Sequence, residues 1–322
     1  MISTHILPKV AVVGAGRVGS SCAFTLMVHN LAGEIALVNR TIERARGEAL
    51  DIAHGVPLLN TTQITYGGYE CCKDADVVVI TIGAAQKPGE TRLELTQRNA
   101  AIFQEVIPQI AHNTPQSILI IVSNPVDVLT HLSIELSGFP SNRVIGSGTV
   151  LDTARLRFEM RKTDPCDFRD IHAYVLGEHG DSEVIPLSIM SIGGMLLEPL
   201  GPEYFGSEQK MKEVAAEVEN NVKNAAYEII RCKGSTHYAI SVCVAKIVES
   251  ILKDQRSVLT VSSRLEGEFG IRDVCLSLPC VVGKDGVLER LLPSLNEKEV
   301  EELRASAGRL REVINQIRAG VE

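Results

Sequence analysis

The sequence has little positive charge for its length and no hydrophobic run long enough to cross a bilayer. Its 322 residues carry 32 Lys and Arg against 40 Asp and Glu, a formal net charge of −8. Partners of nucleic acids and of anionic membrane surfaces usually carry a basic footprint, so we expect neither kind of partner. Small anionic ligands remain compatible, because they respond to the local field of a cleft rather than to net charge.

Signals for export and for metal binding are also missing. The sequence contains no C-x-x-C or H-x-x-x-H pattern, and its eight cysteines are scattered apart from the adjacent Cys71 and Cys72. The N-terminal segment MISTHILPKVAVVGAGRVG has His, Pro and Lys before a short apolar run, unlike a secretory signal. We therefore expect reduced thiols in a cytoplasmic protein without a metal centre.

The composition, with 45% hydrophobic and 22% charged residues, is typical of a soluble globular protein, and the length suits about two domains. In the first half, short apolar runs rich in β-branched residues alternate with segments of helical spacing. Continuous apolarity indicates strands buried on both faces, and their alternation with helices predicts a parallel sheet covered on both sides. The predicted strands are 9–13, 35–38, 77–82 and 118–122, and the predicted helices are 41–54 and 92–111.

The second half has a different pattern. Long amphipathic helices are predicted at 151–161, 211–232 and 297–318, with β-like segments at 173–176, 257–261 and 274–282 and a Pro- and Gly-containing connection at 197–204. We therefore expect a doubly wound parallel α/β domain at 1–147, followed by a mixed α/β (α+β) substrate domain at 148–322.

A glycine-rich loop follows the first predicted strand and opens a predicted helix. The motif G-x-G-x-x-G comprises Gly14, Gly16 and Gly19, with Arg17 and Val18 between the last two glycines. In Rossmann-type dinucleotide-binding domains the first glycine permits a tight turn, the second lets a pyrophosphate approach the backbone, and the third lets helix and strand pack closely. Free N–H groups at the helix start then bind the phosphates. The loop predicts dinucleotide binding.

The end of the second predicted strand bears on the choice of dinucleotide. The fingerprint has an acidic residue about 20 positions after the glycines, where it binds the adenine ribose. This sequence has Asn39, followed by Arg40. Asn39 offers an acceptor without the charge that repels a 2′-phosphate, and Arg40 has the planar fork that binds one. NAD and NADP therefore both remain open.

Three polar elements further along the chain have the chemistry of a proton-transfer site. Asp152 and Arg155, three apart at a helix start, share a helix face. His179 lies in a loop between glycines, and the polar loop 86–92 follows the third predicted strand, at the sheet edge where ligands bind. A loop His with an Asp and an Arg suits proton transfer beside a bound carboxylate. Each element taken alone also fits a structural role.

Several longer motifs occur in a fixed order over nearly the whole chain: GAGRVG, GEALDIAHG, GAAQKPGETRLELTQRN, SNPVDVLT, GSGTVLDTARLR, GEHGDSE and KGSTHYAI. In these motifs the sequence resembles the lactate/malate dehydrogenase family, and within it the bacterial lactate dehydrogenases that respond to fructose 1,6-bisphosphate. The resemblance implies a cytoplasmic, NAD(P)-dependent oxidoreductase of L-2-hydroxy acids, a homotetramer of glycolysis and pyruvate fermentation that interconverts pyruvate and L-lactate.

The resemblance also implies roles for the matching residues. His179 would be the general acid–base, and Asp152 would orient its ring and raise its pKa. Arg155 would grip the substrate carboxylate, and Arg92 would polarise the ketone as its loop closes like a lid. A catalytically silent dinucleotide-binding protein is expected to lack some of these four, so the complete set favours an enzyme. Further implied contacts are with substrate at Gln86, Asn124 and Thr236, and with cofactor at Gly83, Ala84 and Asn124.

Gln86 bears on the substrate. In the family an arginine at this position pairs with the second carboxylate of malate or oxaloacetate. Gln86 is neutral and Glu90 adds negative charge to the same loop, so a dicarboxylate would be poorly compensated in a dry pocket. This favours pyruvate and lactate, and leaves a malate dehydrogenase or a branched-chain L-2-hydroxyacid dehydrogenase as the alternatives.

Arg157 and His172 match positions that bind fructose 1,6-bisphosphate across a subunit interface in the bacterial lactate dehydrogenases. Two symmetry-related copies would place four cationic groups around two phosphates, and such an allosteric effector would favour the active tetramer. The alternative is that Arg157 lies on a helix surface and His172 packs beside a strand.

Overall fold

The computed structural model describes residues 7–84, 89, 91–163 and 166–319. The strands are β1 (Lys9–Val13), β2 (Glu34–Val38), β3 (Gln63–Gly67), β4 (Val77–Ile80), β5 (Ile118–Ile121), β6 (Val144–Gly146), β7 (Ile171–His172), β8 (Ser191–Ile192), β9 (Met195–Leu196), β10 (Ser257–Leu259), β11 (Ser262–Glu266), β12 (Arg272–Ser277), β13 (Cys280–Gly283) and β14 (Gly286–Arg290). The helices are α1 (Arg17–Val28), α2 (Ile42–Gly55), α3 (Arg92–Asn113), α4 (Val126–Ser137), α5 (Val150–Thr163), α6 (Leu197–Tyr204), α7 (Glu208–Lys233), α8 (Tyr238–Leu252) and α9 (Glu297–Ala319). None of the helices in these ranges is both long and apolar enough to span a membrane.

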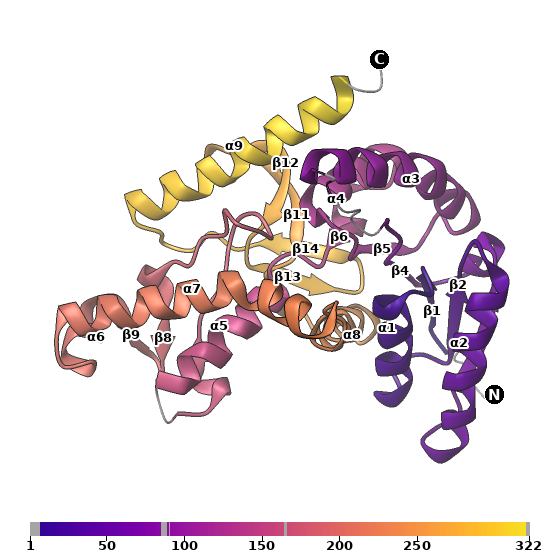
Figure 1. Ribbon diagram of the computed structural model, residues 1–322, viewed down its shortest axis with the longest axis horizontal. Coiled ribbons are helices and arrows are strands. Elements are labelled where there is room, and N and C mark those ends of the chain that lie inside the picture. The colour runs from indigo at the N-terminus through magenta and orange to yellow at the C-terminus, as the bar shows by residue number, and fades with distance from the viewer. Residues whose placement is uncertain (1–6, 85–88, 90, 164–165, 320–322) are drawn as a thin grey trace.

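The main sheet has eight strands in the order β12-β11-β6-β5-β4-β1-β2-β3 (Figure 1). The strands from β3 to β6 pair in parallel, in the 3-2-1-4-5-6 order of a doubly wound dinucleotide-binding sheet. This confirms the predicted fold class. The sheet also extends into the second half of the chain, where β11 joins it antiparallel through Ser262, which pairs with Gly146 of β6.

Helices cover both faces of this sheet. On β1, Val10 and Val12 belong to the core formed with α1, α2 and α8, whereas Ala11 and Val13 belong to the core formed with α3 and α4. All four side chains are completely buried. This two-sided burial is the physical reason for the continuous apolarity of the first-half strands.

The second half packs around two further cores. Helix α9 lies against β11 and β12, while α5 and α7 enclose a core with β7 and β8. Two small antiparallel sheets, β10-β13-β14 and β7-β8-β9, complete this half. Helix α8 returns to the first half, where the hydroxyls of Ser241 and Thr25 on α1 lie 2.9 Å apart. The halves thus share both a sheet and a core.

Two local predictions for the second half are wrong, and a third is correct except that its β segment is divided. Segment 197–204 forms helix α6 rather than a connection, because Leu197 is buried in the core of α5 and α7. Segment 173–176 lies beyond the short strand β7. Segment 274–282 contains parts of two strands, which Pro279 separates because it cannot donate to a ladder. Helices α4 and α8 are not predicted from the sequence. In α4 polar residues such as Asp127 and Thr130 are buried with the apolar ones, and α8 exposes the apolar Tyr238 and Val242, so neither helix has a clear polar face.

Candidate active site

The glycine loop lies at the carboxyl end of β1, beside the point where the strand order reverses. Gly14 has a φ of +110°, and its N–H donates to the Val38 carbonyl at 2.8 Å. A Cβ at Gly19 would lie 1.8 Å from the Gly14 carbonyl oxygen, so only glycine lets α1 pack here. No described atom lies within 4 Å of a Cβ built at Gly16, so the backbone there faces open space. The loop therefore fits a pyrophosphate at the start of α1, whose described first turn has no acidic side chain.

Arg17 connects this loop to the segment before α8. Its exposed side chain donates from Nη1 to Ser235 Oγ at 3.0 Å. The next residue, Thr236, is half-buried, and Val18 packs against the first core. The structure thus brings the predicted cofactor loop and the predicted substrate-wall residue together, although they are far apart in sequence.

Asn39 holds the glycine loop against the end of β2. Its Oδ1 accepts a hydrogen bond from the Ala15 N–H at 3.3 Å, and its Nδ2 donates to the Thr41 carbonyl at 3.0 Å. Arg40 is exposed beside it. The ribose-binding position of the fingerprint therefore has an amide and a neighbouring cation in place of a carboxylate.

Asn99, which the sequence pattern does not single out, organises the loops after β4 and β5. Its Oδ1 accepts from the Ala84 N–H at 2.8 Å, and its Nδ2 donates to the Asn124 carbonyl at 2.9 Å. A Cβ at Gly83 would lie 3.6 Å from the same Oδ1. This buried amide thus joins the predicted cofactor contacts Gly83, Ala84 and Asn124.

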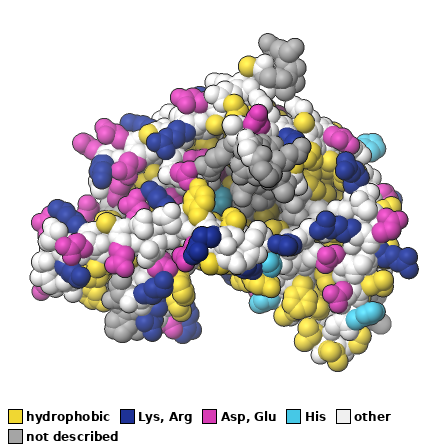
Figure 2. Space-filling view, in the orientation of Figure 1, with side chains coloured by type: hydrophobic (Ala, Val, Ile, Leu, Met, Phe, Trp, Pro, Cys, Tyr) yellow, Lys and Arg dark blue, Asp and Glu magenta, His cyan; other side chains and the backbone are white. Residues whose placement is uncertain are grey.

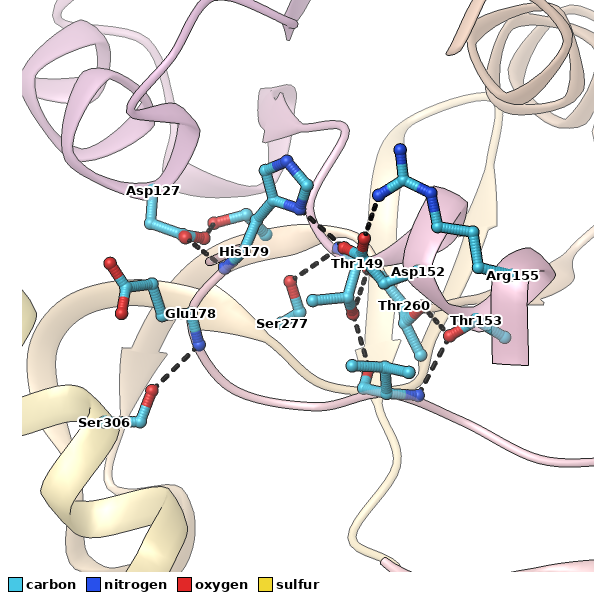
Figure 3. Close-up of polar contacts among 12 residues, drawn as sticks. Asp127, Thr149, Asp152, Thr153, Arg155, Glu178, His179, Thr260, Ser277 and Ser306 are labelled. Carbon is cyan, nitrogen blue, oxygen red and sulfur yellow. Dashed lines mark hydrogen bonds and ion pairs between the residues drawn. The ribbon is translucent and has the colours of Figure 1, made fainter. Parts of the chain in front are cut away.

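His179, Asp152 and Arg155 converge on one another (Figure 3). Asp152 Oδ2 lies 2.5 Å from His179 Nδ1, and Asp152 Oδ1 accepts from Arg155 Nη1 at 2.8 Å. Burial by itself raises the pKa of Asp152, but the His179 ring and the Arg155 guanidinium hold that pKa below its ordinary value. Burial disfavours the charged His179 ring, yet the Asp152 carboxylate outweighs it and raises the pKa of His179 to about 9. The ring is therefore a proton donor at neutral pH.

Thr153 fixes α5 against the segment that leads to His179. Its Oγ1 accepts from the Val175 N–H at 2.9 Å and lies 3.0 Å from Thr260 Oγ1 (Figure 3). These buried contacts set the distance between the helix that carries Asp152 and the loop that carries the histidine.

Asp127, another residue that the sequence pattern does not single out, holds the main chain of His179. Asp127 Oδ2 accepts from the His179 N–H at 2.8 Å, and Oδ1 accepts from Ser262 Oγ at 2.6 Å (Figure 3). Its side chain is 2% exposed, and this burial raises the pKa of Asp127 to about 6. Because Asp127 lies on α4 and Ser262 on β11, one carboxylate joins both halves to the catalytic loop. Its signal in the sequence is an acid inside the apolar run PVDVL.

Of the loop 86–92, for which we predict a lid, the structure describes Gly89, Thr91 and the backbone of Arg92. Gln86 and Glu90 lie outside the described residues, and so does the side chain of Arg92. The backbone of Arg92 begins α3, where Thr91 and Glu94 form a capping box with Glu94 N–H donating to Thr91 Oγ1 at 3.2 Å. The roles expected for Gln86 and Arg92 stay predictions.

Arg157 and His172 come from neighbouring elements. Arg157 on α5 donates from Nη2 to the Ala173 carbonyl at 3.3 Å, and its guanidinium lies 5.8 Å from the Tyr174 ring centroid. Burial lowers the pKa of Arg157. His172 on β7 is exposed. The Arg157 guanidinium is therefore held at the main chain of Ala173, the residue that follows His172.

The cysteines are not part of the group formed by His179, Asp152 and Arg155. All eight are free, and burial raises the pKa of the Cys22 thiol to about 12. In the described ranges, no group of three or more His, Cys, Asp or Glu side chains is placed to hold a metal ion.

Comparison with known proteins matches both halves of the chain to one enzyme family. Residues 8–146 match the NAD binding domain of lactate/malate dehydrogenase, and residues 149–321 match the alpha/beta C-terminal domain of the same family. The chain is 45% identical over 314 residues to an L-lactate dehydrogenase of Acetivibrio thermocellus, which covers 98% of each chain. It is 46% identical over 312 residues to an L-lactate dehydrogenase of a Synechococcus species, covering 96% of this chain and 99% of that one.

Solved structures give the same relationship. A lactate dehydrogenase from a Medee basin deep-sea metagenome library superposes with a TM-score of 0.91 at 39% identity, over 96% of this chain and 98% of that one. A minor L-lactate dehydrogenase from Enterococcus mundtii superposes with a TM-score of 0.90 at 38% identity, with the same coverage. Both halves match the family along their length, so the chain belongs to the lactate/malate dehydrogenase family and its first half is the NAD-binding domain.

Proposed function

We propose that the protein is an L-lactate dehydrogenase, which interconverts pyruvate and L-lactate with NAD as cofactor. The observation that carries this proposal is the 2.5 Å contact between His179 and the buried carboxylate of Asp152, which also binds Arg155. This arrangement combines a proton donor with a cation for the substrate carboxylate. The L-lactate dehydrogenases similar to this chain over nearly its whole length support the choice of substrate.

The glycine loop and its neighbours fit the cofactor. Gly16 offers open backbone beside a helix N-terminus, and Asn39 stands at the ribose position. When bound, NADH supplies the hydride that reduces the ketone carbon of pyruvate. The residues that would hold the cofactor are Gly14, Gly16, Arg17, Val18, Gly19, Asn39, Arg40, Gly83, Ala84 and Asn124.

His179 performs the proton transfer. With Nδ1 held by Asp152, its Nε2 gives a proton to the ketone oxygen of pyruvate, so that carbonyl reduction yields a hydroxyl group. In the reverse direction, the neutral ring takes the hydroxyl proton of lactate. The Asp152 carboxylate stabilises the imidazolium form and fixes which nitrogen faces the substrate.

The cations orient the substrate. A guanidinium has five N–H donors, so Arg155 retains donors for a two-pronged grip on the substrate carboxylate beyond its bond to Asp152. Arg92 polarises the ketone as the lid closes. Asn124 and Thr236 border the substrate, and neutral Gln86 leaves a second carboxylate without a partner.

We also propose that the enzyme is a homotetramer. Large apolar side chains are exposed on three helices, an arrangement typical of subunit interfaces. Figure 2 shows hydrophobic side chains gathered on the part of the surface formed by α1 and α2. The exposed side chains are Phe24 and Val28 on α1, Ile42 and Leu50 on α2, and Tyr238 and Val242 on α8.

Arg157 and His172 are the residues that we propose for fructose 1,6-bisphosphate, with their copies from a second subunit. The adjacency of Arg157 to the backbone beside exposed His172 supports this pairing. The free thiols support a reducing, cytoplasmic location.

A substrate panel tests the proposed activity. Purified protein is assayed with NADH and pyruvate, oxaloacetate or 2-ketoisocaproate. We expect kcat/KM for pyruvate to exceed the other two by about 100-fold, since one pocket cannot accommodate a methyl, a carboxylate and a branched chain equally. Equal or higher kcat/KM with oxaloacetate or 2-ketoisocaproate would contradict the assignment.

A further inference from the structure

A cavity lies in the C-terminal half, beside the turn that follows His179. Its volume is about 460 Å³, within the range of about 300–1,000 Å³ that is usual for small-molecule sites. Its lining residues come from α7 and α9, with α5 and α6 contributing to its wall. Of the described residues assigned to substrate or cofactor, none lines it.

The wall of this cavity contains a buried carboxyl group, Glu183. Its side chain is 6% exposed, and its Oε1 has no hydrogen-bond partner among the described residues. The Glu183 N–H donates to the Gly180 carbonyl at 3.2 Å, so the side chain is carried by the turn that follows the catalytic histidine. Burial and then the nearby Asp152 raise the pKa of Glu183 well above its ordinary range. A buried carboxyl group without an ion pair is costly to ionise, which favours a ligand that supplies a counter-charge.

The other acids of the cavity already have partners. Glu219 binds Lys223 at 2.6 Å, and Glu302 binds Lys298 at 3.5 Å. Glu299 accepts from the Ser188 N–H at 3.1 Å. The wall carries six carboxylates against three cationic side chains. This charge balance favours a cationic ligand, and Glu183 is the acid of the wall that has a buried carboxyl oxygen without a hydrogen-bond partner among the described residues.

The remaining wall is largely aliphatic. Leu156 and Met160 come from α5, Val214 and Val218 from α7, and Met190 from the segment before β8. All five are buried in one core. The exposed Glu302 on the same wall shows that the cavity reaches the protein surface. An occupant would therefore enter from solvent with an apolar body and a single charged group.

We propose that this cavity binds a small organic cation, with an ammonium group paired to Glu183 and an aliphatic chain packed among the side chains of α5 and α7. The ammonium supplies donors and a counter-charge to the Glu183 carboxyl group, which ionises on pairing because its raised pKa keeps it largely protonated at neutral pH without a partner. This inference does not rest on the proposed dehydrogenase activity, because it uses none of the residues assigned to substrate or cofactor.

The probe for this site is n-hexylammonium, with n-hexanol as its uncharged match. Binding to the full-length protein is measured by isothermal titration calorimetry, with and without saturating pyruvate. We expect saturable binding of n-hexylammonium that pyruvate does not displace, and at least about tenfold weaker binding of n-hexanol. Glu183→Gln should lower the n-hexylammonium affinity about tenfold or more. Glu302→Gln, which removes an exposed acid of the same wall, should leave it within about twofold.

A second variant keeps the test decisive if Glu183→Gln folds poorly. Val218→Phe fills the aliphatic part of the cavity without touching the carboxyl group, and it should abolish n-hexylammonium binding. Equal n-hexylammonium affinity in the wild-type and Glu183→Gln proteins overturns the proposal. So do displacement by pyruvate, absence of saturable binding to the wild-type protein, and unchanged binding in Val218→Phe.

Discussion

Asp152 Oδ2 lies 2.5 Å from His179 Nδ1, while Asp152 Oδ1 binds Arg155 Nη1 at 2.8 Å. One buried carboxylate thus holds both the proton donor and the cation that we assign to the substrate carboxylate. Its negative charge keeps His179 protonated, and its geometry keeps the two functional side chains at a fixed separation. Loss of this charge is therefore expected to affect proton transfer and substrate binding together.

Asp152→Asn should lower kcat/KM for pyruvate by about 10²–10⁴-fold, because the general acid loses its orienting charge. The wild-type rate of pyruvate reduction should fall as pH rises through about 9, the pKa of His179, because the neutral ring has no proton to give. Lactate oxidation should rise over the same range. In Asp152→Asn both limbs should move toward about 6.5, the ordinary pKa of histidine. Steady-state pH profiles in both directions check this, and limbs unchanged at about 9 would refute the role of Asp152.

Asp127 should set the acidic limit of the enzyme. Above about pH 6 its carboxylate accepts from both His179 N–H and Ser262 Oγ, whereas the protonated acid has to use one oxygen as a donor. Pyruvate reduction should therefore decline as pH falls through about 6. Asp127→Asn cannot titrate and, like the protonated acid, offers one acceptor oxygen and one donor, so it should lose this limb and show the reduced low-pH activity at every pH.

Two further variants separate positioning from folding. Asp127→Ala removes both acceptors and should lower kcat by about 100-fold through a displaced His179 loop. Ser262→Ala keeps the acceptor for His179 and should leave kcat within a few-fold, with a modest loss of stability of about 1 kcal/mol. An acidic limb that persists unchanged in Asp127→Asn would assign it to another group.

Gln86→Arg should redirect substrate preference. The new guanidinium would pair with the second carboxylate of oxaloacetate inside the closed lid, so the ratio of kcat/KM for oxaloacetate to that for pyruvate should rise by about 100-fold or more. Gln86→Lys is the control, since an ammonium provides charge without the bidentate fork and should give a smaller shift. Unchanged selectivity in Gln86→Arg would remove Gln86 from the pocket.

The position of Asn39 predicts measurable activity with NADPH. The amide of Asn39 lacks a carboxylate's charge, and exposed Arg40 lies next to it. Asn39→Asp should lower kcat/KM for NADPH relative to NADH by about tenfold or more, because like charges repel at the 2′-phosphate. Arg40→Ala should lower the same ratio by removing the phosphate partner. A strong preference for NADH in the wild-type protein, unchanged by Arg40→Ala, would exclude a phosphate-binding role.

Fructose 1,6-bisphosphate should lower the apparent KM for pyruvate, measured near pH 6 and at about pH 7.5, because the ligand would favour the active tetramer. Arg157→Gln and His172→Gln should each weaken the response without changing the basal kcat. Steady-state kinetics with and without the bisphosphate check this. If the bisphosphate leaves the KM for pyruvate unchanged at both pH values, an effector site here is excluded.

Much of the NAD-binding half is readable from local pattern. The strands β1, β2, β4 and β5 appear as short apolar runs because their side chains alternate into two cores, as Val10 and Ala11 do on β1. Likewise, Gly14 and Gly19 can be recognised in the sequence, because the positive φ of Gly14 and the close backbone contact at Gly19 arise within one turn. The helices with one polar face, such as α9, are also recovered. In contrast, α4 buries polar residues with its apolar ones and α8 exposes apolar ones, so both lack a polar face and are missed.

What the sequence by itself determined is the kind of chemistry: a dinucleotide loop, a histidine with an acid and an arginine, and a neutral residue at the lid. What only the tertiary structure decided is which groups hold these residues in place. Asp127 meets Ser262 across 135 positions and Arg17 meets Ser235 across 218. Such pairs leave no spacing pattern, because their partners are chosen by how the sheet, α4 and α8 pack. Glu183 likewise reads as one more surface acid, and only the packing of α5, α7 and α9 buries it beside a cavity.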